Sequence, residues 1–117
     1  MSVHELTWGK AIEILGDYLG ALRREAESRL NIKIPSMWFD DWKLHPPLAQ
    51  LPMVYNLTLW MERFCHENGI DTKPIFNEID KKHNGLLKQV AAYIVRALLG
   101  KEFQEWFTGG LNERPRT

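Results

Sequence analysis

The segment 85–100 places the strongest constraint on the fold, because it leaves almost no polar face. Eleven of the fourteen residues between its two end glycines are apolar. At 100° per residue, its three polar side chains fall in one narrow sector: Lys88, Gln89 and Arg96. The segment is shorter than the ~20 apolar residues that cross a bilayer. We therefore predict that residues 86–99 form a near all-apolar central helix, covered on all sides by other helices.

A long first helix is predicted by apolar residues that recur every three or four positions from Trp8 to Ala26. It has two candidate starts, a capping box from Ser2 to Glu5 and a second N-cap at Thr7. A separate stripe of the same helix carries three glycines: Gly9, Gly16 and Gly20. Each glycine lowers helix propensity by up to ~1 kcal/mol. The stripe indicates either the close approach of another helix or drift at exposed positions.

Two further helices follow in the middle of the chain. Pro52 suits the first turn of a helix over residues 53–67, and Asn68-Gly69 is a common ending. Asp71 or Thr72 can cap the next helix, which either stops at Asn84-Gly85 or continues through it at a cost of only ~1 kcal/mol. We expect a short terminal helix around Phe103, Trp106 and Phe107.

These elements predict an all-α, single-domain, antiparallel bundle of four to five helices over residues 1–110, with a flexible tail at 111–117. At 117 residues the chain is long enough for one core. Its one cysteine cannot form an internal disulfide, and its first residues lack the basic and apolar regions of a signal peptide. We expect a cytoplasmic protein.

The stretch 31–48 interrupts the helical period and is predicted to be a long connection, closed by Pro46-Pro47. Within it, Ser36 to Trp42 can form a short helical turn that places Trp38 and Trp42 on one face. The aromatic side chains either cover one end of the bundle from inside or bind a partner. The candidate partner-binding residues are Trp38, Phe39, Asp40, Asp41 and Trp42.

No catalytic or cofactor pattern is present in the sequence. Four residues offer metal-binding side chains, in a spacing that matches no known four-ligand motif: Glu62, Cys65, His66 and His83. Adjacent residues of a helix point about 100° apart, so Cys65 and His66 cannot form a thiol–imidazole pair, and we expect Cys65 to be buried. The fifteen basic and fifteen acidic residues cancel, which disfavours binding to a nucleic-acid backbone.

The absence of a catalytic pattern and the surplus of tryptophan together favour a non-enzymatic protein. We expect it to act through protein–protein interaction, as an adaptor, inhibitor or regulator of the kind found in phages and mobile elements. A homodimer is one form of that interaction. The alternative function is a metal- or cofactor-binding bundle, and nucleic-acid binding ranks below both. No cofactor and no membrane partner are expected.

Overall fold

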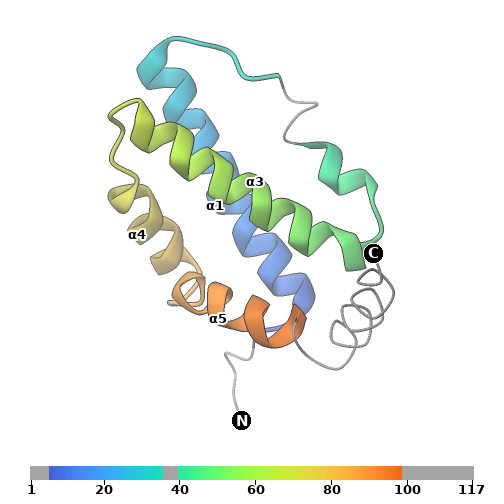
Figure 1. Cartoon of the computed structure of the whole chain (residues 1–117). Coiled ribbons are helices and arrows are strands. Elements are labelled where there is room, and N and C mark those ends of the chain that lie inside the picture. Colours follow the sequence, from blue (N-terminus) through green and yellow to red (C-terminus); the bar gives the residue numbers. More distant parts are fainter. Residues whose placement is uncertain (1–5, 36–39, 99–117) are drawn as a thin grey trace, which may run out of the picture.

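The structure is a computed structural model, and it describes residues 6–35 and 40–98. The helices in these residues are α1 (Trp8–Leu30), the 3-10 helix η1 (Asp41–Leu44), α3 (Pro47–Glu67), α4 (Lys73–Lys82) and α5 (Leu87–Leu98) (Figure 1). The described residues contain no strand. The predicted all-α bundle is therefore confirmed. None of the described helices is long and apolar enough to cross a membrane.

The central helix of the bundle is α1, which packs against α3, α4 and α5. Thr7 is its N-cap, with a side-chain oxygen that accepts a hydrogen bond from the Lys10 amide at 3.1 Å. Ser2 and Glu5 lie outside the described residues. The predicted apolar stripe provides most of the buried face: Ala11, Leu15, Tyr18, Leu19, Leu22 and Ala26. Ile14, outside the predicted stripe, is also buried, whereas Trp8 and Ile12 of the stripe are only partly buried.

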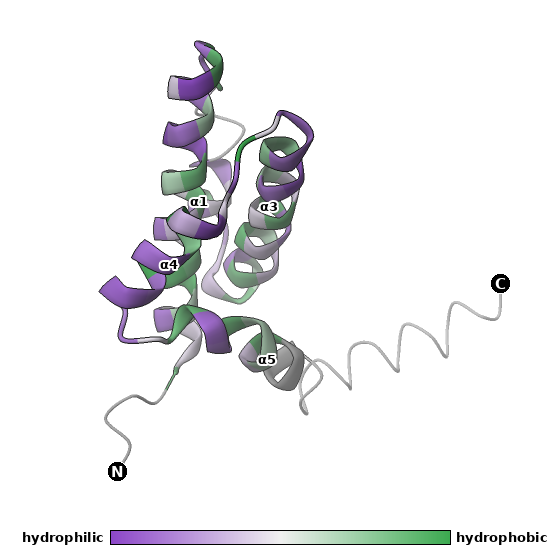
Figure 2. Ribbon diagram, turned by 90° about the vertical axis from the view of Figure 1, so that its left-hand side faces the viewer, coloured by the Kyte–Doolittle hydropathy of each residue, from purple (hydrophilic) through white to green (hydrophobic). Residues whose placement is uncertain are grey.

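The structure does not bear out the central position predicted for residues 86–99. α5 lies across the lower end of α1 and α3 (Figures 1 and 2) and packs against α1 and α4. Its inner side chains Leu87, Val90 and Ile94 are buried, as is Leu86 just before it. Its other described side chains include exposed Lys88, Gln89, Ala91 and Ala92. The alanines count as apolar in the sequence pattern, but each exposes only a small apolar area to water. Burial of one face is therefore sufficient for this helix.

α1 and α3 run in the same direction, whereas the sequence predicted antiparallel neighbours. Their first turns meet where the Trp8 indole Nε1 donates to the Pro47 carbonyl at 2.8 Å. Further along, the Tyr18 hydroxyl donates to Glu62 at 2.6 Å. Both helices then end on the same side of the molecule (Figure 1). The connection between them must therefore return the chain along α1, and it does so through the backbone at Ile34, which accepts from Arg23 at 3.2 Å.

α3 begins at Pro47, five residues before the start predicted at Pro52. Either proline has the fixed φ that suits a first helical turn. Pro52 instead lies inside the helix, where it cannot donate to the carbonyl of Leu48. Because Leu48 and Asn56, one turn to either side, are exposed, water can reach the free carbonyl. The connection before α3 therefore ends at Pro46, two residues earlier than the predicted range 31–48.

The turns on either side of α4 follow the predicted residues. Gly69, just beyond the end of α3, has φ 74°, and Asn84 and Gly85 have φ 57° and 82°. A left-handed backbone ends a helix, so the helix stops at Asn84-Gly85 and does not continue through it. At the start of α4, the Asp71 side chain accepts from the Lys73 amide at 3.1 Å.

Candidate functional site

The most exposed large apolar side chains of the described residues lie at the turn from η1 into α3, residues 44–48, here called the corner. Leu44 is 82% exposed and Leu48 is 65% exposed. Pro46 and Pro47 between them are also exposed. The corner therefore presents four apolar residues to solvent within five positions of the chain.

Hydrogen bonds hold the corner in a fixed shape. The Gln50 side-chain amide donates to the His45 carbonyl at 2.7 Å and to the Lys43 carbonyl at 3.3 Å. The Trp8 indole donates to the Pro47 carbonyl, which fixes the corner to the start of α1. Pro46 and Pro47 each restrict φ. The exposed side chains are thus carried on an ordered backbone.

Trp42, one of the predicted partner-binding residues, is instead part of the core. It is 6% exposed, and a Cβ added at Gly16 of α1 would lie 3.4 Å from the far edge of its ring. The group that lies over Gly16, at ordinary contact distance from an added Cβ, is therefore an indole, where the sequence suggested either a helix or drift at an exposed position. This position agrees with the alternative in which the connection covers the bundle. It leaves Trp42 without surface for a partner.

The acidic residues beside Trp42 lie next to basic side chains at the surface. Asp40 lies 3.5 Å from Lys43 and 3.8 Å from Arg23, and Asp41 lies 3.9 Å from His45. Trp38 and Phe39 lie outside the described residues. The pairs place charges of both signs next to the corner. Pairs as exposed as these contribute little to stability.

The four candidate metal ligands do not converge on one point. Glu62 accepts from Tyr18, His66 bonds to the Thr72 hydroxyl at 3.0 Å, and His83 bonds to Asp17 at 2.7 Å. Within residues 6–35 and 40–98, no group of three or more His, Cys, Asp or Glu side chains is arranged to hold a metal ion.

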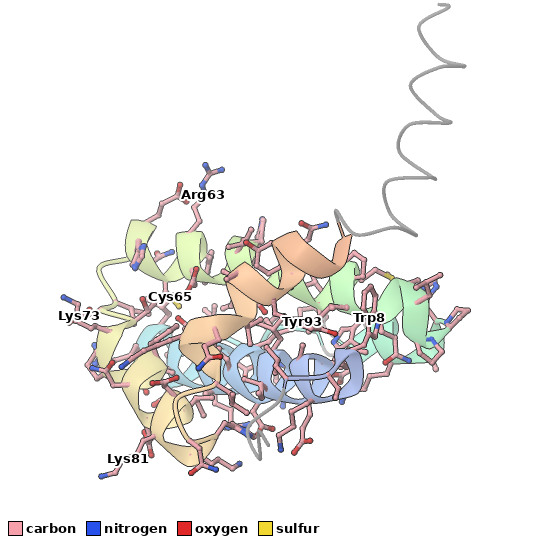
Figure 3. The ribbon with its side chains drawn as sticks, turned by 90° about the horizontal axis from the view of Figure 1, so that it is seen from below. Trp8, Arg63, Cys65, Lys73, Lys81 and Tyr93 are labelled. Carbon is pink, nitrogen blue, oxygen red and sulfur yellow. The ribbon has the colours of Figure 1, made fainter. Side chains whose placement is uncertain are left out.

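Cys65 is fully buried, as expected from its place in the sequence. Figure 3 shows it directed toward the other helices, while Arg63 on the same helix points away from them. Burial raises the pKa of the Cys65 thiol, and the charges of Glu25 and Glu62 raise it further. Because the thiolate is the nucleophile, this thiol stays unreactive.

Two polar contacts connect α1 to its neighbours. Burial and the hydrogen bond to Glu62 raise the pKa of Tyr18 far above its ordinary value, so the phenol stays a donor. Burial also raises the pKa of Asp17, but the hydrogen bonds and charges of His83 and Lys82 outweigh it and leave the pKa below 3.8. Asp17 and His83 are 66 positions apart, so local sequence patterns do not reveal the contact.

The sequence itself indicates an exposed apolar corner, beside the more conspicuous aromatic residues of the same connection. Leu44 and Leu48 flank Pro46-Pro47 in a stretch without helical period, so no helix face was available to bury them. Comparisons with protein-family models, with curated proteins and with solved structures gave no match.

Proposed function

We propose that the protein acts by binding another protein through the corner, as an adaptor, inhibitor or regulator, and that it catalyses no reaction. The observation that carries the proposal is the exposure of Leu44 and Leu48, at 82% and 65%. Isolated exposed leucines are ordinary on protein surfaces. Two leucines that flank two exposed prolines on a braced turn form a local apolar feature that folding alone does not require.

The braced backbone supports binding because it lowers the entropy lost on association. Gln50 and Trp8 already hold the carbonyls of His45 and Pro47 in place. A partner that accepts the corner therefore does not have to order this backbone, and more of the contact energy contributes to affinity. Such preorganisation is typical of effective binding surfaces.

The chemistry of the corner indicates the kind of partner surface that fits it. The leucines and prolines are apolar, while exposed Asp41, Lys43 and His45 form a polar edge. An apolar centre with a polar rim is the usual arrangement of a protein interface. The matching surface is an apolar pocket on a partner, with a second copy of this chain as one candidate because the edge carries both charges.

Comparison of matched variants in a quantitative pull-down from the source cells tests the proposal. The double variant Leu44→Ser/Leu48→Ser removes the apolar side chains of the corner. Ile32→Ser is the matched control, because Ile32 is 42% exposed and lies outside the corner. We expect a protein captured by the wild type and by Ile32→Ser to be lost with the double variant. Equal capture by all three would refute the proposal. A mass measurement in solution tests whether the partner is a second copy of this chain.

A further inference from the structure

A second apolar stripe runs along α3 beside its buried face. The residues of the buried face are Leu51, Val54, Thr58, Met61 and Cys65. At 100° per residue, the second stripe lies about 110° further around the helix: Leu48, Pro52, Tyr55 and Leu59. Leu48 is 65% exposed and Leu59 is 45% exposed. The packing of α3 against α1 and η1 therefore leaves both ends of this stripe open to solvent.

The stripe continues the corner along the helix, because Leu48 belongs to both. Its members follow one another at steps of four, three and four residues, which is the spacing of side chains that pack against another helix. From Leu48 to Leu59 the stripe extends about 16 Å. A partner that binds the corner can therefore lay a helix along α3. The identity of that partner, which rests on the binding function proposed for the corner, follows from the symmetry of the stripe.

The stripe is symmetric about its midpoint. An exposed leucine stands at each end, and the partly buried rings of Pro52 and Tyr55 stand on either side of the centre. When two copies of α3 run antiparallel about a two-fold axis at this midpoint, Leu48 of each copy lies opposite Leu59 of the other. Pro52 then lies opposite Tyr55. A two-fold dimer requires one patch that fits itself, and the stripe meets this requirement at both ends at once.

The centre of the stripe also carries one free acceptor and one free donor. Pro52 has no N–H, so the Leu48 carbonyl lacks its helical donor. The Tyr55 hydroxyl forms no hydrogen bond with another described residue. In the antiparallel pair, Tyr55 of each copy lies beside the turn from Leu48 to Pro52 of the other. Each group thus supplies the missing partner of the other, and the interface does not bury an unpaired carbonyl.

Complementary charges flank the two ends of the stripe. Arg63, one turn beyond Leu59, points away from the other helices (Figure 3) and forms no ion pair within the described residues. Asp41, next to the corner, is exposed, and in the same part of the chain only His45 lies within ion-pair distance of it, at 3.9 Å. The antiparallel order brings Arg63 of one copy to the corner of the other, on the side of Asp41. The two ends therefore offer opposite charges to a second copy.

We infer that the partner of the corner is a second copy of this chain, bound by antiparallel packing of the two α3 helices. The corner and the stripe of each copy cover those of the other. Removal of Leu44, Leu48 and Leu59 from water supplies the apolar contact. Arg63 and Asp41 form part of the polar rim around it.

The mass of the full chain in solution, measured by light scattering after size exclusion over a range of concentrations, tests the dimer. We expect twice the 13.7 kDa of one chain. Leu59→Ser changes the stripe outside the corner and is expected to raise the Kd of the dimer about tenfold, because each dimer loses two apolar contacts. Ile32→Ser is the matched control, because Ile32 is 42% exposed and lies on neither surface, and it should leave the Kd unchanged. A monomeric wild type at every concentration, or equal effects of the two variants, would overturn the inference.

Cysteine cross-linking tests the antiparallel order. A mixture of Leu48→Cys and Leu59→Cys, oxidised together, is expected to give a disulfide-linked dimer with one chain of each variant, because the two positions face each other. Each variant alone should give no such dimer, because its two new cysteines lie about 16 Å apart, too far for a disulfide. The native Cys65 is buried in both. Cross-linking of either variant alone as readily as the mixture would contradict the antiparallel order.

The pull-down with Leu44→Ser/Leu48→Ser separates failure of the dimer from failure of the function proposed for the corner. If the chain is a monomer and this double variant still loses a captured protein, the corner binds a different protein and the dimer is wrong. If the chain is a dimer that Leu59→Ser weakens, both the corner and its partner are identified.

Discussion

Replacement of Trp42 by alanine tests whether this residue anchors the connection in the core. Trp42 is 6% exposed and packs against Gly16 of α1. Removal of a large buried aromatic side chain costs about 3–5 kcal/mol. The buried and unpaired Nε1 reduces that cost, because its removal relieves about 1–3 kcal/mol. From the midpoints of these two ranges, we expect Trp42→Ala to lower the free energy of unfolding by about 2 kcal/mol.

Trp42→Phe separates the two contributions. Phenylalanine keeps an aromatic ring in the core but loses roughly two ring carbons, worth about 1.5 kcal/mol at about 0.8 kcal/mol per carbon. It also removes the unpaired N–H, which returns a similar amount. We therefore expect Trp42→Phe to change the free energy of unfolding by less than about 1 kcal/mol.

Urea unfolding followed by far-ultraviolet circular dichroism measures both values. Leu44→Ala is the control, because Leu44 is 82% exposed and its truncation should change stability by no more than about 0.5 kcal/mol. A loss below about 1 kcal/mol for Trp42→Ala would show that Trp42 is not a core residue. Both variants lose the N–H, so a cost of about 1.5 kcal/mol or more for Trp42→Phe, the full value of the lost ring carbons, would show that the unpaired N–H does not carry the cost assigned to it.

Three further predictions concern the packing of α1 and the turn before α5. Tyr18→Phe removes the 2.6 Å hydrogen bond to Glu62 and is expected to cost about 1.5–3 kcal/mol in urea unfolding, and no loss would contradict a role for this bond. Gly85→Ala is expected to lower stability by about 1–2 kcal/mol because φ is 82°, whereas Gly9→Ala in α1 meets no atom within 4 Å and should not destabilise. The folded pKa of Asp17 is depressed, so its stabilising contribution is present above its ordinary pKa of 3.8 and is lost as pH falls through the lowered value. The stability difference between wild type and Asp17→Asn should therefore shrink at acid pH, and a constant difference would argue against the contact with His83 and Lys82.

The sequence alone determined the features that depend on neighbouring residues. The 3.6-residue period identified α1 and its buried face, and Asn84-Gly85 marked a helix end because a left-handed backbone is accessible to these residues. These features depend on backbone geometry within a turn or two, so the chain encodes them locally. The all-helical class followed from the same patterns.

Only the tertiary structure decided which helix is central and which apolar side chains remain exposed. Periodicity shows which residues share a face, but it does not show which other element covers that face. For that reason the pattern predicts a central helix at 86–99, although α1 holds that place, and it offers Trp42 to a partner, although the structure buries this side chain against Gly16. The parallel course of α1 and α3 returns the connection along α1, buries Trp42 and leaves Leu44 and Leu48 at the corner. These outcomes depend on contacts between residues far apart in the chain, which no local pattern specifies.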